Sequence, residues 1–171
     1  MKITQAKAER HVLAITVDNE AGILAKITGL FSARGYNIES LTVADVSDDH
    51  AVSRITVVTN GPPPVIDQIM AQLDRLVPVH KVTDLTTAGP HVERELALIK
   101  VAGSGDKRVE ALRVAEIFRA HVVDTTTTSF VFELTGAPEK IDSFVALMRD
   151  LGLVEVGRSG VVGMMRGAQG V

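Results

Sequence analysis

The stretch HVLAITVDNEAGILAKITGLF, residues 11–31, combines the pattern of a buried strand with that of an amphipathic helix. Its first part is apolar and rich in branched side chains up to Val17, and it ends at Asp18 and Asn19, which favour turns. Apolar residues then recur at helical spacing. They are Ile23, Leu24, Ile27, Leu30 and Phe31. Gly35 follows where a left-handed helix stop is expected. The stretch therefore predicts a strand, a short polar turn and a helix.

The residues after this helix predict a hairpin, a second helix and a fourth strand. Residues 38–46 and 51–59 are largely apolar and flank the polar, turn-forming residues 47–50. The run Gly61-Pro62-Pro63-Pro64 interrupts the strand pattern and favours a helix start. An apolar stripe between residues 65 and 76 marks that helix, and residues 77–85 read as a strand that completes a βαββαβ unit.

The same order of elements recurs after the polar connector 86–91, with a period of about eighty residues. In the second copy we expect a turn at residues 103–106 with Asp106 as the helix cap. The predicted helices and strands are 96–102, 109–119, 122–126, 130–134, a helix from Pro138, and 153–156. The fold class is therefore α+β, with two ferredoxin-like domains. Both helices of such a domain cover one face of its sheet, which leaves the other face without a partner in the domain. We therefore expect the protein to oligomerise.

These patterns divide the chain into four parts. We expect an N-terminal extension over residues 1–10, a first domain over 11–86 and a second domain over 92–160. The last part, 161–171, is rich in glycine and is predicted to be a flexible tail rather than another packed element.

Composition narrows the function. The chain has 171 residues, of which 46% are apolar and only 4% aromatic, a net charge of -3 and no cysteine. Aliphatic side chains suffice for a packed core, whereas a basic face and stacking aromatics for nucleic acid are missing. A thiolate metal site is excluded, and no apolar run reaches the length of a signal peptide core or a membrane span. We expect a cytoplasmic protein that binds neither nucleic acid nor membranes.

A search for catalytic groups gives little. The histidines are scattered singly without an H-x-H or H-E-x-x-H pair, so neither a metal site nor a catalytic residue is predicted. Gly103-Ser104-Gly105 could open a phosphate loop or form a plain turn, and Arg108 in place of a third glycine favours the turn. The hydroxyl-rich residues 125–129 favour an edge hairpin.

Two polar positions are candidate ligand sites. The helix that starts near Gly22 offers unpaired N–H groups and a positive dipole end to a carboxylate, and Gly22 has no Cβ to block close approach. The alternative is an Asx cap at Asn19 followed by a loose first turn. Asn37 carries a donor and an acceptor at the start of an apolar strand, and its alternative is a turn residue. The spacing by itself favours the structural alternatives.

Several stretches of the sequence resemble those of a known protein family. Three stretches of the first domain closely resemble the small regulatory subunit of bacterial acetohydroxyacid synthase, also called acetolactate synthase. They are NEAGIL (19–24), LFSARGYNIESLTV (30–43) and SRITV (53–57). VERELALIKV (92–101), IFRA (117–120) and RSGVVG (158–163) resemble its C-terminal domain. The resemblance covers nearly the whole chain. Departures are the Thr-rich run 125–129, the triple proline and the pair Met164-Met165.

The resemblance implies an N-terminal ACT domain that binds an amino acid. It implies a subunit without an active site or cofactor of its own, which activates a separate catalytic subunit and confers feedback inhibition by valine or another branched-chain amino acid. Thiamine diphosphate, Mg²⁺ and FAD are expected on that catalytic partner. The implied effector-binding residues at the first loop are Asn19, Ala21, Gly22, Ile23 and Leu24. Asn37 and Ile38 are expected to face them across an ACT homodimer interface.

Two alternatives remain. A free-standing ACT-type sensor that acts on another enzyme or regulator keeps the fold and changes the partner. A small ferredoxin-like enzyme, such as a phosphoryl-transfer protein, would need residues 103–108 or His121 to act in catalysis.

Overall fold

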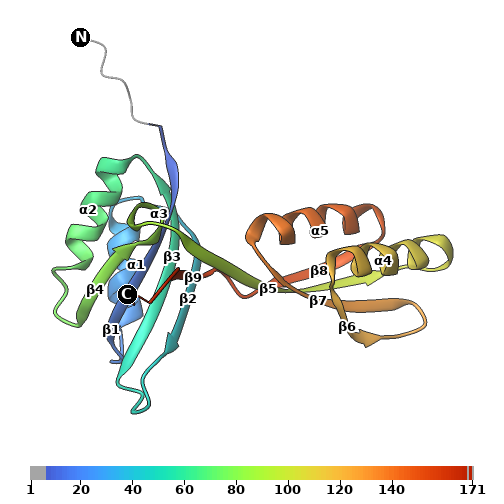
Figure 1. Cartoon of the computed structure of the whole chain (residues 1–171), viewed down its shortest axis with the longest axis horizontal. Coiled ribbons are helices and arrows are strands. Elements are labelled where there is room, and N and C mark those ends of the chain that lie inside the picture. The colour runs from blue at the N-terminus through green and yellow to red at the C-terminus, as the bar shows by residue number, and fades with distance from the viewer. Residues whose placement is uncertain (1–6, 169, 171) are drawn as a thin grey trace, which may run out of the picture. The chain divides into compact units, whose positions relative to one another are not determined.

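The computed structural model describes residues 7–168 and 170, which form two compact units. The first unit holds the chain up to Val92 together with the residues from Val161 onward, and the second unit is Glu93–Gly160. The second unit is thus inserted into the first. Each unit has the predicted βαββαβ order, so the α+β class is confirmed (Figure 1).

The first unit is a four-stranded antiparallel sheet in the order β2-β3-β1-β4 with two helices on one face. Its elements are β1 (Glu9–Asp18), α1 (Ile23–Ala33), β2 (Ile38–Asp45), β3 (Val52–Gly61), α2 (Pro63–Leu73) and β4 (Val79–Asp84). The core between helices and sheet is aliphatic apart from Phe31, and its fully buried members include Leu13, Ile15, Ile27 and Ile55.

Local sequence signals set the helix ends in this unit. Gly35 has φ +68°, and the chain turns there after α1. Pro63 and Pro64 open α2, where the missing N–H groups cost nothing because a helix start has no partner for them, and Pro62 before them is extended.

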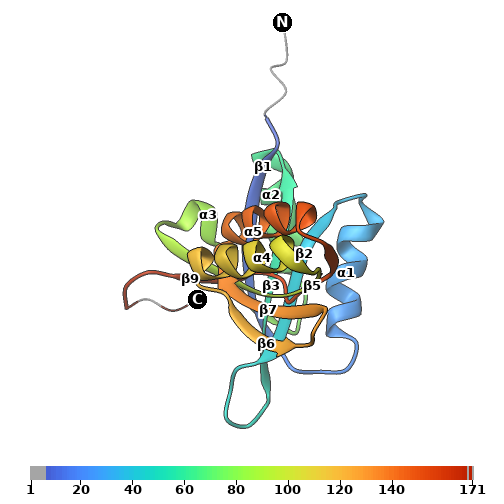
Figure 2. The same ribbon diagram turned by 90° about the vertical axis from the view of Figure 1, so that its right-hand side faces the viewer.

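The second unit repeats the topology with strand order β6-β7-β5-β8. Its elements are β5 (His91–Ala102), α4 (Gly105–Phe118), β6 (His121–Thr125), β7 (Ser129–Gly136), α5 (Pro138–Asp150) and β8 (Leu153–Arg158). The core is more aromatic here, since Phe132 and Phe144 are fully buried and meet edge to face at 6.0 Å. Helices α4 and α5 run side by side over the same face of the sheet (Figure 2).

The C-terminal segment differs from the prediction. Residues 162–165 form a strand, β9 (Val162–Met165), which pairs with β5 and belongs to the first unit. Val161 is 4% exposed and packs with Val12, Ala14, Val58 and Leu85 on the face of the first sheet that the helices leave open. The prediction that no packed element follows residue 160 is therefore wrong, because the segment fills a face for which the sequence pattern supplied no partner.

Smaller corrections concern element ends. Glu9 and Arg10 are part of β1 rather than of an N-terminal extension, and residues 1–6 of that predicted extension lie outside the described residues. The connector predicted at 86–91 contains a short helix, α3 (Leu85–Ala88), whose N-cap is Asp84. Helix α4 is capped at Ser104 without a side-chain bond, so the predicted Asp106 cap is wrong and Asp106 lies in the first turn. None of the helices over residues 7–168 has the length and apolar character needed to cross a membrane.

Candidate effector site

The loop between β1 and α1 positions the first group of predicted site residues. Gly22 is the N-cap of α1 with φ +87°, a left-handed conformation that glycine adopts without strain. A Cβ built on Gly22 meets no atom within 4 Å, so the space in front of the loop is open. The backbone conformation explains the glycine, and a bound group can approach it closely.

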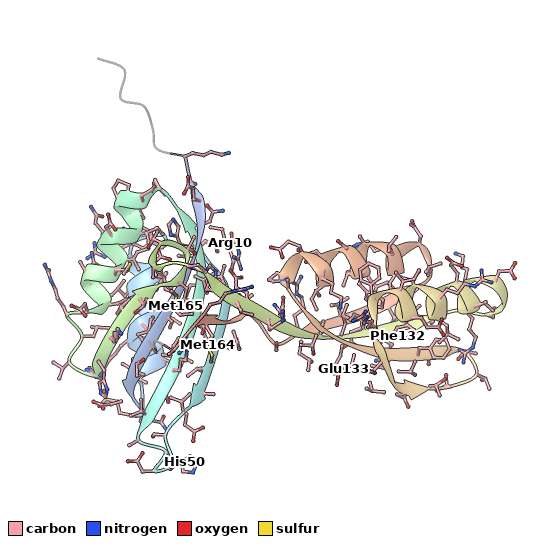
Figure 3. All side chains as sticks on the ribbon, in the orientation of Figure 1. Arg10, His50, Phe132, Glu133, Met164 and Met165 are labelled. Atoms are coloured by element: carbon pink, nitrogen blue, oxygen red, sulfur yellow. The ribbon has the colours of Figure 1, made fainter. Side chains whose placement is uncertain are left out.

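Asn19 does not cap the helix. Its side-chain Nδ2 donates to the carbonyl oxygen of His50 at 2.8 Å, and its backbone N–H donates to the carbonyl of Ala51 at 2.7 Å. The Asx-cap alternative for Asn19 is therefore wrong, since the capping position is Gly22 without a side-chain bond. Asn19 instead fastens the loop to the β2–β3 hairpin, whose tip carries His50 (Figure 3).

The first turn of α1 presents free donors next to Gly22. The Ile23 N–H bonds the Glu20 carbonyl at 3.3 Å, and the Lys26 N–H bonds that of Gly22 at 3.0 Å. The N–H groups of Leu24 and Ala25 donate to no described residue. Such donors, aligned with the positive end of the helix dipole, suit a carboxylate.

Charged side chains border this end of the unit. Lys26 Nζ lies 2.8 Å from Glu20 Oε1, and both side chains are exposed. In the neighbouring hairpin the hydrogen bond from His50 lowers the pKa of Asp45, and the bond from the Ser47 hydroxyl lowers that of Asp49. These carboxylates stay ionised at neutral pH and give the hairpin a negative character.

Asn37 and Ile38 lie at the start of β2. The Asn37 carbonyl accepts a hydrogen bond from Thr59 Oγ1 at 2.7 Å, which fixes the backbone. The Asn37 side chain is exposed and bonds no described residue, whereas Ile38 packs against the core. The amide of Asn37 is thus available to a ligand or to a second chain.

The structure does not bring Asn19 and Asn37 together within one chain. Both β1 and β2 pair with β3, with Asp18 opposite Val52 and Ile38 opposite Thr59. Val52 and Thr59 are seven residue steps apart on β3, which corresponds to about 23 Å of strand. One small ligand therefore cannot contact both asparagines of the same chain.

Other polar groups that sequence patterns did not single out are paired within the fold. His11 Nδ1 lies 2.7 Å from Asp84 Oδ2 with both side chains buried, and His80 Nε2 lies 2.7 Å from Asp18. Periodicity cannot reveal these pairs because their members lie 73 and 62 residues apart. Within the described ranges no three His, Cys, Asp or Glu side chains are grouped as a metal ion would require.

The hydroxyl-rich run forms the tight end of the β6–β7 hairpin. Thr126 Oγ1 accepts the N–H groups of Thr128 and Ser129 at 3.2 and 3.0 Å. Arg108 donates to the Thr126 carbonyl at 2.8 Å and stacks over Phe130 at 3.8 Å from the ring centroid. The hairpin prediction is confirmed, and Arg108 has a role in holding it.

Comparison with known proteins assigns the two parts of the chain. Residues 13–81 match the family model described as an AHAS small subunit-like ACT domain. Residues 94–167 match the one described as the small subunit of acetolactate synthase. The chain belongs to the acetolactate synthase small-subunit family. The predicted family and the ACT assignment of the first domain are thereby confirmed.

Individual relatives of this small-subunit family cover nearly the full length. The acetolactate synthase isozyme 3 small subunit of Salmonella typhimurium is 48% identical over 92% of this chain and 96% of its own length. A probable acetolactate synthase small subunit of Archaeoglobus fulgidus is 43% identical over 92% of this chain and 98% of its own. The crystal structure of the Thermotoga maritima small subunit superposes with a TM-score of 0.84 at 36% identity, covering 94% and 99% of the two chains.

Proposed function

We propose that this chain binds the catalytic subunit of acetolactate synthase, raises its activity and makes it subject to feedback inhibition by valine. Membership of the small-subunit family supports the partner. In this proposal the chain carries no active site, and thiamine diphosphate, Mg²⁺ and FAD belong to the catalytic subunit.

The observation that best supports an effector site is the geometry of the β1–α1 loop. Two free N–H groups, a left-handed Gly22 with open space before it and the helix dipole are suited to an amino-acid carboxylate. Ile23 and Leu24 start the apolar face of α1 beside that position, and Leu24 is only half-buried. A branched aliphatic side chain would find apolar contact there.

The distance between Asn19 and Asn37 argues for a shared site. Strand β2 is an edge strand, so its outer N–H and C=O groups can pair with a second chain. Antiparallel pairing of two β2 edges about a two-fold axis places the start of one β2 opposite the end of the other. Because β1 and β2 run parallel on either side of β3, Asn37 of the partner subunit then approaches the Asn19–Leu24 loop. We therefore place valine between the chains of a homodimer.

Reconstitution tests the proposal. The purified chain is added to its purified catalytic subunit, and pyruvate condensation is measured with and without valine. We expect no turnover by the chain alone, a higher rate on mixing and a lower rate when valine is added. Turnover by the isolated chain, or an unchanged catalytic rate on mixing, would overturn the proposal. Valine binding without any effect on that catalytic subunit would favour the free-standing sensor instead.

A further inference from the structure

Residues 161–165, here called the strap, lie on the open face of the first sheet. Val161 and Gly163 are buried, while Val162 and Met164 are 49% and 60% exposed. The strap thus turns alternate residues toward the sheet, as a strand covering an apolar surface does. Met164 and Met165 mark its position against the first unit in Figure 3.

Side chains of β2 and β3 form hydrogen bonds with the strap backbone. Ser40 Oγ accepts the Val161 N–H at 2.8 Å, and Thr42 Oγ1 donates to the Val161 carbonyl at 3.1 Å. Arg54 donates to the Gly163 carbonyl at 2.7 Å. The backbone N–H and C=O of Val161 are thus both bonded to side chains of β2, which fixes the strap relative to that strand.

The position of Gly163 leaves no room for a side chain. A Cβ there would lie 2.6 Å from Leu85 Cδ1 and 3.2 Å from Val12 Cγ1, and both neighbours are fully buried. The strap is therefore seated in one register, because sliding by a residue would push Val162 or Met164 into the sheet.

The two connections between the units start from different edges of the first sheet. The chain leaves through β4 and α3, and β4 is one edge, whereas the returning strap is held by β2, the other edge, and by β3. A displacement of β2 within the sheet therefore acts directly on the returning connection. The outgoing connection is reached only through the strap, where β9 pairs with β5 and the Arg166 N–H donates to the Pro90 carbonyl.

We propose that the strap transmits the effector state of β2 to the second unit. This inference rests on the proposed function, since Asn37 at the start of β2 is placed in the valine site. When valine draws the start of β2, Ser40 and Thr42 carry Val161 with it. Val161 follows directly on Gly160, the last residue of the second unit. Without the seated strap, valine still binds but inhibits the catalytic subunit less strongly.

The test uses Gly163→Val, with Met164→Val as the matched control that places the same residue on the exposed side. Hydrogen exchange over residues 161–166, valine affinity of the isolated subunit, and activation and valine inhibition of the reconstituted enzyme are measured. For Gly163→Val we expect fast exchange in the strap, a valine Kd within twofold of wild type and retained activation. The valine concentration for half inhibition should rise at least fivefold, the low end of typical allosteric coupling. Met164→Val should match wild type throughout.

The Ser40→Ala, Thr42→Val double variant removes the two β2 hydrogen bonds without adding bulk, and it decides the matter if Gly163→Val does not fold. Fast strap exchange with an unchanged inhibition curve in either folded variant would overturn the inference, and so would a strap that stays protected in Gly163→Val. Wild-type controls separate the two levels. A wild-type subunit that neither activates nor confers valine inhibition refutes the proposed function and this inference with it. If the wild type behaves normally and variants with a released strap are still inhibited by valine, only the coupling is refuted.

Discussion

Each unit pairs an acidic with a basic side chain at the same point of the same topology, in opposite order. Both members are buried in the first unit, whereas in the second only the acidic member is. In the first unit the first strand carries the basic member, His11, and the last strand carries Asp84. In the second unit the first strand carries Glu95 and the last carries Arg158. The registers make the positions equivalent, because Asp84 and Arg158 lie opposite residues that follow His11 and Glu95 by two.

The equivalent pairs fasten different elements. Arg158 also bonds Asp142 of α5 at 2.6 Å, and its hydrogen bond to Glu95 raises its pKa further above the usual range. Asp84 instead accepts the Thr86 N–H at 3.0 Å and so caps α3, whose first residue Leu85 packs against the strap. The two pairs thus occupy equivalent positions but hold different elements. Arg158 holds helix α5 in the second unit, and Asp84 holds helix α3, which packs against the strap, in the first.

The open faces of the two sheets differ accordingly. The strap covers that of the first sheet. On the second sheet Leu96 and Leu98 remain 38% and 44% exposed, and a hollow of about 280 Å³ lies beside Lys100 and Gly157. Phe132 and Glu133 illustrate the two sides of this sheet in Figure 3, with Phe132 toward the helices. Of the two described sheets, the first therefore has its open face covered by the strap, while the second keeps apolar side chains exposed on its own.

The largest expected effect compares the two cores. Ile55 and Phe132 are equivalent, since they face Ile15 and Ile99 on the first strands, and both are fully buried. Phe132→Ala should lower the free energy of unfolding by about 3 to 5 kcal/mol and Ile55→Ala by about 2 to 5 kcal/mol. Hydrogen exchange should place each loss in its own unit. Equal loosening of β1–β4 by Phe132→Ala would show that the units are not separate cores.

The pair in the second unit should contribute the next largest effect. Arg158→Met leaves Glu95, whose side chain is 5% exposed, buried without its cation. Breaking a fully buried pair costs about 3 to 5 kcal/mol, and the 38% exposure of Arg158 reduces this to about 2 kcal/mol. Chemical denaturation measures it. Lys100→Met, which breaks the exposed pair with Glu155, is the control and should leave the midpoint unchanged. Equal losses in both variants would contradict the account.

Asp84→Asn should destabilise the first unit by about 1 to 2 kcal/mol, because the carboxylate accepts hydrogen bonds from His11, Thr86 and Thr87. It should also speed hydrogen exchange in α3 and in the strap, while β5–β8 exchange as in wild type. Slower or unchanged exchange of the strap in a destabilised variant would separate Asp84 from the support of that segment.

Gly22→Asp should cost about 1 kcal/mol or less of stability, since φ +87° is unfavourable for a side chain while an acid near a helix start is favourable. Its effect on valine should be larger. Two negative charges about 4 Å apart repel by about 4 kcal/mol at an effective dielectric near 20, and half of that weakens binding roughly thirtyfold. Calorimetry with valine measures this effect. Gly29→Asp adds the same charge at an exposed position further along α1 and should bind valine normally. An unchanged affinity in Gly22→Asp would remove the loop from the site.

The smallest effect is expected at the hairpin tip. His50 lowers the pKa of Asp45, so this pair contributes stability above the ordinary carboxyl range and loses it as pH falls through the lowered pKa. Both side chains are exposed, so Asp45→Asn should leave the melting temperature at pH 7 unchanged. A clear drop on thermal melting would assign the hairpin a structural role that its exposure argues against.

The sequence predicted those parts of the fold whose signals are local. The apolar spacing of α1, the stop at Gly35 and the prolines that open α2 are read within a few residues, and the structure has them. The strap was missed because its partners Ser40 and Thr42 are 121 and 119 residues away, and nothing in a glycine-rich stretch shows that it will be covered. The predicted loop residues lie together, whereas Asn37 lies at the opposite end of β3 within the same chain and meets them only in the proposed homodimer.

The most direct test of the shared valine site is the binding stoichiometry of mixed dimers. Asn19→Ala and Asn37→Ala chains are purified separately, then combined as a tagged heterodimer and titrated with valine by calorimetry. A site built from Asn19 of one chain and Asn37 of the other leaves each homodimer without an intact site and restores one intact site in the heterodimer. We predict that the heterodimer binds one valine with wild-type affinity while both homodimers bind it weakly. A heterodimer as weak as its parents would contradict the shared site.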